Sequence, residues 1–132
     1  MITTRNKPRQ PDAGNTEDLN MNIVINKKSA GQLSIIERSR GLRCSFTVEN
    51  YEAGIDFFST GNNGGCKGWI KQSTDTNKMW AAYFWNSDKI RADGTLGAIE
   101  SFPYCKTLNA ALSIIERASY AEQERSRTRV EV

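Results

Sequence analysis

Aromatic and basic side chains alternate in the middle of this 132-residue chain. Lys67 and Lys71 flank Trp69 on one predicted strand, and the run 79–85 is apolar on both of its alternating faces. Bases of single-stranded nucleic acid stack on aromatic rings while Lys and Arg contact phosphates. The pattern therefore predicts a nucleic-acid-binding sheet face. The residues expected to form this face are Arg43, Lys67, Trp69, Lys71, Trp80, Lys89 and Arg91.

The same aromatic residues have other interpretations. Side chains alternate across a strand, so Trp80 and Phe84 point one way while Tyr83 and Trp85 point the other. One sheet face must be covered, so about half of the aromatics belong to the core. A protein partner is the alternative to nucleic acid, because Trp and Tyr are frequent anchors at interfaces. The chain would then be an inhibitor or adaptor of the mobile-element type, and a homodimer through the aromatic face is a related expectation.

Catalytic chemistry has little support in the sequence. The chain has no histidine, the commonest general base and metal ligand. The glycine-rich stretch 61–68 lacks the glycine before and the hydroxyl after its lysine that a phosphate loop requires. Acidic residues are scattered, and no nucleophile motif of the G-x-S-x-G type occurs. We therefore expect a non-catalytic binding module with no cofactor and no metal.

Composition and charge suggest one soluble domain. The net charge is +3, and the charges of the first twenty residues cancel, as do those of residues 122–132. Three cysteines without a C-x-x-C spacing indicate reduced thiols in a cytoplasmic protein, and no apolar stretch predicts a membrane segment. We expect a disordered leader over 1–20, a single domain over 21–125 and a frayed tail over 126–132.

The pattern of apolar residues predicts an α+β fold. A short strand is expected over 21–26, followed by a short helix near 30–40 with Ser29 as its N-cap and Gly41 after its end. Period-two segments and turn residues then predict an antiparallel meander of four to five strands. These strands cover 43–49, 55–59, 66–72, 79–85 and 95–102. A long C-terminal helix over about 108–125, capped by Thr107, is expected to pack on one sheet face.

One hexapeptide occurs twice. Leu-Ser-Ile-Ile-Glu-Arg spans residues 33–38 and again 112–117. A duplicated helix that pairs with its copy is one interpretation, and chance similarity of two amphipathic helices is the other. Since the flanking residues do not match, we favour chance, although the repeat supports a helix at 33–38.

About fifty residues in the second half of the chain carry a pattern of short matches to a known family. The matching residues are 68–70, 78–82, Gly97, Ser101, Phe102, Thr107, Ala110 and Ala111. This pattern resembles the AP2 or integrase-type DNA-binding domain. In that family the face of a three-stranded sheet, backed by one helix, enters the major groove, so the resemblance implies a DNA-binding sheet face. The segment 86–101 is longer than the hairpin of the family, and basic residues are sparse on the strands that would read DNA.

Overall fold

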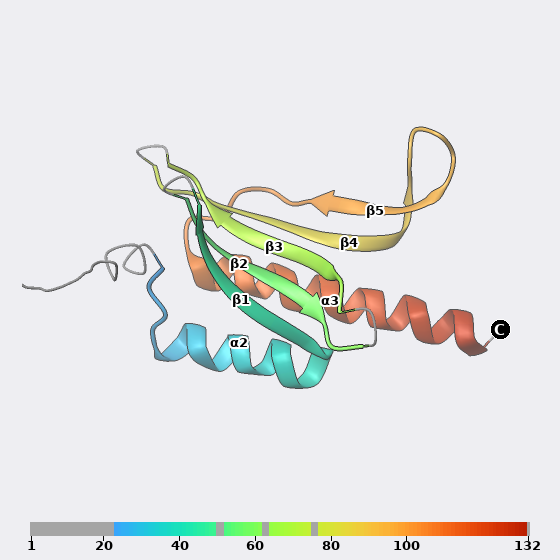
Figure 1. Cartoon of the computed structure of the whole chain (residues 1–132), viewed down its shortest axis with the longest axis horizontal. Coiled ribbons are helices and arrows are strands. Elements are labelled where there is room, and N and C mark those ends of the chain that lie inside the picture. The colour runs from blue at the N-terminus through green and yellow to red at the C-terminus, as the bar shows by residue number, and fades with distance from the viewer. Residues whose placement is uncertain (1–22, 50–51, 62–63, 75–76, 132) are drawn as a thin grey trace, which may run out of the picture.

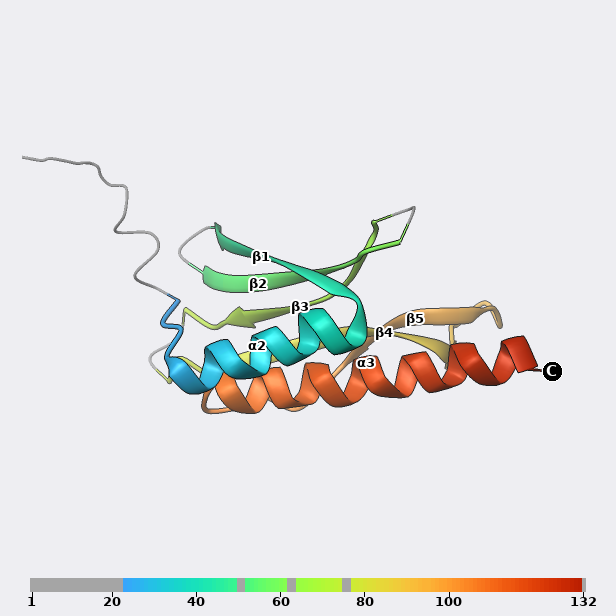
Figure 2. The same ribbon diagram turned by 90° about the horizontal axis from the view of Figure 1, so that it is seen from below.

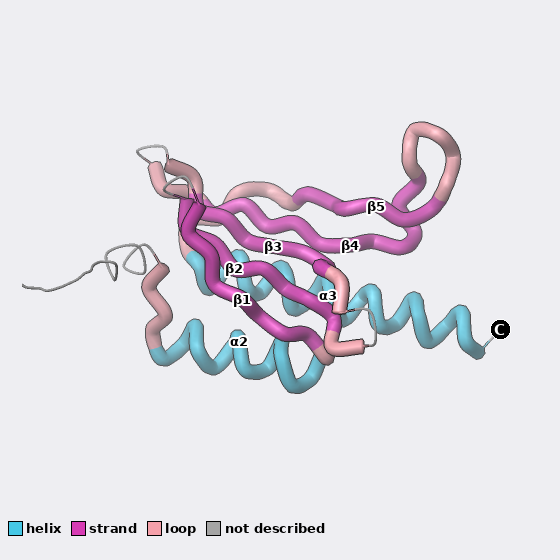
Figure 3. The backbone as a smooth tube through the Cα atoms, in the orientation of Figure 1, coloured by secondary structure: helices cyan, strands magenta, loops and turns pink. Residues whose placement is uncertain are grey.

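The computed structural model describes residues 23–49, 52–61, 64–74 and 77–131. They form an α+β fold in which a five-stranded antiparallel meander has the strand order β1-β2-β3-β4-β5 (Figures 1 and 3). Both helices lie on the same side of this sheet (Figure 2). The predicted fold class is confirmed, while the predicted leader lies outside the described residues. The elements are α2 (Lys27–Arg40), β1 (Leu42–Glu49), β2 (Glu52–Ser59), β3 (Cys66–Gln72), β4 (Trp80–Ile90), β5 (Leu96–Ser101) and α3 (Leu108–Glu131).

The core lies between the helices and one face of the sheet. Alternate residues of the central strands point into it, including Phe57 of β2 and Ile70 of β3. Ile36 of α2 and Ile115 of α3 are fully buried against these strands. Each such side chain contributes roughly 1.5–3 kcal/mol on burial, so this layer holds the fold together.

The start of α2 differs from the prediction. Asn26 is the N-cap, and its side-chain oxygen accepts a hydrogen bond from the Ser29 amide at 2.8 Å. Ser29 itself is buried within the helix, and its hydroxyl donates to Asn109 Oδ1 at 2.8 Å. The predicted Ser29 cap is therefore wrong, and residues 23–26 form no strand because Asn26 already begins the helix. Gly41 ends α2 in the left-handed conformation (φ 65°), as predicted.

The two copies of the repeated hexapeptide lie side by side. α2 and α3 run in the same direction and pack against each other (Figure 2). The Ser29–Asn109 bond and a 2.6 Å contact between the Gln32 amide and the Ser113 hydroxyl fix this alignment. In both copies the leucine and the second isoleucine are buried. Identical residues thus bury the same two positions in neighbouring helices.

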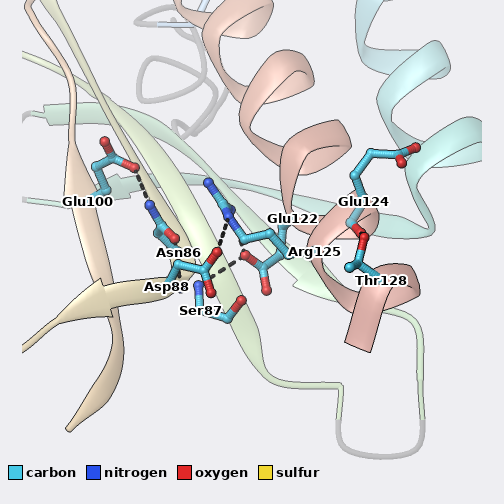
Figure 4. Close-up of polar contacts among 8 residues, drawn as sticks. All are labelled: Asn86, Ser87, Asp88, Glu100, Glu122, Glu124, Arg125 and Thr128. Atoms are coloured by element: carbon cyan, nitrogen blue, oxygen red, sulfur yellow. Dashed lines mark hydrogen bonds and ion pairs between the residues drawn. The ribbon is translucent and has the colours of Figure 1, made fainter. Parts of the chain in front are cut away.

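The ends of two elements extend beyond the predicted limits. β4 continues to Ile90 because α3 supports it: the Ser87 amide donates to Glu122 Oε1 at 3.0 Å, and Arg125 contacts Asp88 at 3.4 Å (Figure 4). α3 continues to Glu131, so the tail predicted to fray from residue 126 is helical over most of its length. Within the described residues, no helix combines the length and apolar character needed to cross a bilayer.

Candidate binding site on the open face of the sheet

The face of the sheet opposite the helices, here called the open face, carries the candidate site. Strand register aligns Asp56, Trp69 and Tyr83 on three neighbouring strands, each one residue out of phase with the buried positions. Both helices lie on the other side of the sheet (Figure 2). The residues whose alternation places them on the open face include Arg43, Asp56, Phe58, Lys67, Trp69, Lys71, Met79, Ala81, Tyr83, Trp85 and Ile99.

An aromatic pair occupies the centre of the open face. Trp69 of β3 and Tyr83 of β4 are direct cross-strand partners, and their rings stack with centroids 5.1 Å apart and an interplanar angle of 27°. Both side chains are half-buried. Pairs of this kind contribute about 0.5–1.5 kcal/mol beyond their burial, so the two rings form a fixed platform.

The platform borders a hollow of about 640 Å³. Apolar and aromatic groups supply one part of its wall, and amide, hydroxyl and charged groups supply the rest. The volume lies within the range of small-molecule sites. The lining residues are Asp56, Trp69, Lys71, Gln72, Ser73, Thr74, Met79, Ala81, Tyr83 and Tyr104.

Two cations lie over other aromatic rings of the same face. The Arg43 guanidinium is 4.8 Å from the centroid of the Phe58 ring, and Lys67 Nζ is 5.8 Å from that of Trp85. Such contacts hold each charge against an apolar surface while its outer side faces solvent. Basic groups therefore lie on β1 and β3, on either side of β2.

Trp85 is held against β5 by a glycine. A Cβ at Gly97, whose φ is +99°, would lie 2.6 Å from the Trp85 ring. Only glycine accepts both that conformation and that approach. Arg91 Nε donates to the Gly97 carbonyl, which holds the Arg91 side chain beside this ring.

The sequence prediction placed Trp80 on the binding face, and this is wrong. Trp80 lies on the covered face, is 6% exposed and exchanges two backbone hydrogen bonds with Cys105. Since both faces of this strand are apolar, the sequence did not indicate which alternate set the helices would cover. Tyr83 of the same strand lies on the open face, but the prediction did not include Tyr83 among the site residues.

The other predicted residues fall into two groups. Arg43, Lys67, Trp69 and Lys71 share the open face, with Lys71 in the wall of the hollow. Lys89 and Arg91, by contrast, lie at and just beyond the end of β4 that is farther from the hollow. Lys89 is exposed, whereas the Arg91 side chain reaches the Gly97 carbonyl beside Trp85. The prediction missed Asp56, Phe58, Met79 and Tyr104; the alternation of Asp56 and Phe58 with apolar Ile55 and Phe57 was the signal for two of them.

The cysteine thiols add no negative charge near neutral pH. Burial, reinforced by the Glu37 carboxylate, raises the pKa of Cys44 to about 12, and burial raises the pKa of Cys66 and Cys105. Across the part of the chain that the structure describes, Cys, Asp and Glu nowhere gather in threes that would hold a metal ion. Among the side chains that the structure describes, those whose alternation places them on the open face include basic Arg43, Lys67 and Lys71 and acidic Asp56.

Comparison with known proteins identifies no relative: searches against protein-family models, curated proteins and solved structures each found no match.

Proposed function

We propose that the open face binds single-stranded nucleic acid. The observation that carries the proposal is the Trp69–Tyr83 stack beside the hollow, with Lys71 in the same wall. Unpaired bases present their flat faces to such a platform, whereas paired bases in a duplex are already stacked on each other. The proposed ligand is therefore single-stranded.

The positions of the charges suggest a path for the backbone. Arg43 on β1 and Lys67 on β3 lie in the cross-strand row on one side of the platform, with their charged groups over Phe58 and Trp85. Lys71 lies on the other side of the platform, in the wall of the hollow. Phosphates on either side of a stacked base would meet Lys71 at one side and Lys67 or Arg43 at the other. Asp56 opposes them and keeps the surplus of positive charge modest, so we expect weak, salt-sensitive affinity.

Fluorescence anisotropy with labelled oligonucleotides at low salt tests the proposal. Trp69→Ala removes half of the platform and should weaken binding by roughly 5- to 150-fold, since one base stacked on an aromatic ring contributes about 1–3 kcal/mol. Tyr120→Ala is the matched control: Tyr120 is 50% exposed and lies on α3, in the helical layer away from the open face. This variant should bind like the wild type.

Salt dependence supplies a second measurement. The double variant Arg43→Ala/Lys67→Ala should flatten the slope of log K against log salt by about 1.4 if both cations meet phosphates, since each phosphate contact on a single strand contributes about 0.7. Lys28→Ala/Lys106→Ala, which removes two exposed lysines from outside the sheet, should leave the slope unchanged. Absence of binding at low salt, or an affinity that Trp69→Ala does not alter, would rule the proposal out.

A protein partner is the second candidate function. Met79, Ala81 and Ile99 add apolar surface to the open face, and interfaces favour Trp, Tyr, Met and Arg. Capture of one protein from a host lysate that survives nuclease treatment, and is lost in Trp69→Ala, would favour this alternative over nucleic acid.

A further inference from the structure

The outer edge of β1 has the features of an unused pairing edge. β1 pairs with β2 through an uninterrupted register from Leu42 to Glu49, and no other described strand lies on its outer side. It contains no proline and no bulge, the devices that usually protect the edge of a sheet. The edge is therefore straight enough to accept another strand.

One hydrogen bond reveals which amides point outward. The Cys44 amide donates to Glu37 Oε1 of α2 at 3.4 Å, so it points away from β2. Because amide direction alternates along an antiparallel strand, the amides of Phe46 and Val48 point outward as well. α2 thus shields the beginning of the edge and leaves its second half open.

An exposed aromatic side chain lies at the same place. Phe46 is 51% exposed, although it shares the covered side of the sheet with its cross-strand neighbour Ile55, which is fully buried. A large apolar group beside open backbone donors is the combination from which edge-to-edge association starts.

We infer that β1 pairs antiparallel with β1 of a second copy of this chain, about a two-fold axis at Phe46. This register places Phe46 opposite its own copy and Cys44 opposite Val48, which brings outward-pointing backbone groups together. It also places Arg43 opposite Glu49 in the register. The interface is self-complementary, as a two-fold dimer requires.

This dimer goes beyond the proposed function and does not depend on it. The two-fold axis stands perpendicular to the sheet, so the open faces of both copies lie on the same side of one continuous sheet. Glu37 must release the Cys44 amide for the pairing to form, and Glu37→Ala should therefore strengthen the dimer.

Sedimentation equilibrium without nucleic acid tests the inference. The wild type should be a dimer, and Phe46→Glu should weaken the association by at least about tenfold because two buried carboxylates would face each other. Leu96→Glu is the matched control, since Leu96 is 60% exposed at the other edge strand, β5. It should dimerise like the wild type.

A cross-link fixes the register. Paired backbone positions of this kind bring two Cα atoms to about 5.5 Å, within reach of a disulfide. In a background where the three cysteines are serine, Phe46→Cys should form a covalent dimer on oxidation, and Leu96→Cys should not. A monomeric wild type, a dimer broken by Leu96→Glu but not by Phe46→Glu, or a dimer without the Phe46→Cys cross-link would overturn the inference.

Discussion

The two faces of the sheet carry similar residues with opposite fates. β4 alone presents Trp80 and Phe84 to the helices, and Tyr83 and Trp85 to the open side. The helices bury the first pair. Of the second pair, Tyr83 stacks on Trp69, and Trp85 lies under Lys67 while it also packs against the edge of the core. The difference shows that the cover, and not the side-chain type, decides which aromatic residues hold the fold and which are available to a ligand.

Two adjacent phenylalanines of β2 allow the covered face and the open face to be compared directly. Phe57 is fully buried on the covered face, while Phe58 lies half-buried on the open face beneath Arg43. Phe57→Ala should lower the free energy of unfolding by about 3–5 kcal/mol, because it leaves a cavity in the core. Phe58→Ala should cost only about 1 kcal/mol. Urea denaturation measures both, and equal losses would contradict the division between the faces.

Cysteine reactivity tests the same division by chemistry. With its pKa raised to about 12 from 9.0, Cys44 holds about a thousandfold less thiolate at pH 8 than an ordinary thiol. Exposed Cys66 should therefore react with iodoacetamide first, as followed by mass spectrometry of the labelled peptides.

The sign of the accompanying stability change follows from the raised pKa. The folded state favours the protonated Cys44 thiol, so its contribution is complete below pH 9.0 and is lost as the pH rises towards 12. Cys44→Ala should reduce this alkaline loss. Faster labelling of Cys44 than of Cys66 would show that the edge of the covered face opens readily.

Close packing at a glycine gives a third test of the covered face. A Cβ at Gly68 would lie 2.5 Å from the Phe84 ring and against the Tyr83 carbonyl, so Gly68→Ala should destabilise the protein by about 1–3 kcal/mol. Gly31 on α2 is the control, since a Cβ at this position would have no neighbour within 4 Å. Gly31→Ala should stabilise by up to about 1 kcal/mol through helix propensity. Thermal unfolding measures whether each variant is less or more stable than the wild type.

The smallest expected effect concerns the polar anchor between β4 and α3. Arg125 contacts Glu122 at 2.8 Å and Asp88 at 3.4 Å (Figure 4). Arg125→Ala should cost about 0–1 kcal/mol, as is usual for partly exposed ion pairs. Arg127→Ala, which removes a pair within α3 alone, should cost less. A loss of several kcal/mol at Arg125 would mean that this anchor, and not the core, holds β4.

The sequence predicted the meander and the long helix because their signals are local. Alternation in β1, the bounds of β3 and the Thr107 cap of α3 depend on neighbouring residues, and the Thr107 hydroxyl does accept from the Ala110 amide at 3.1 Å. The extension of β4 was not predictable, because it depends on Glu122 and Arg125 from a distant helix.

The candidate site was predictable only in part for the same reason. Lys67, Trp69 and Lys71 alternate with Gly68 and the buried Ile70, so local alternation alone assigns these three residues to one face. Trp80 was assigned to the wrong face because residues 80–85 include no charged side chain that would distinguish the two sides of β4. The sequence also could not show that the two identical hexapeptides lie on neighbouring helices, because this depends on the packing of α2 against α3.

The most direct test of the division between the two faces measures affinity and stability on one variant. Trp69→Ala/Tyr83→Ala removes the whole platform from the open face and leaves the covered face intact. We predict that single-stranded oligonucleotide affinity falls by more than about tenfold while the free energy of unfolding falls by no more than about 2 kcal/mol. A folded double variant that binds as tightly as the wild type would contradict the proposed role of the open face.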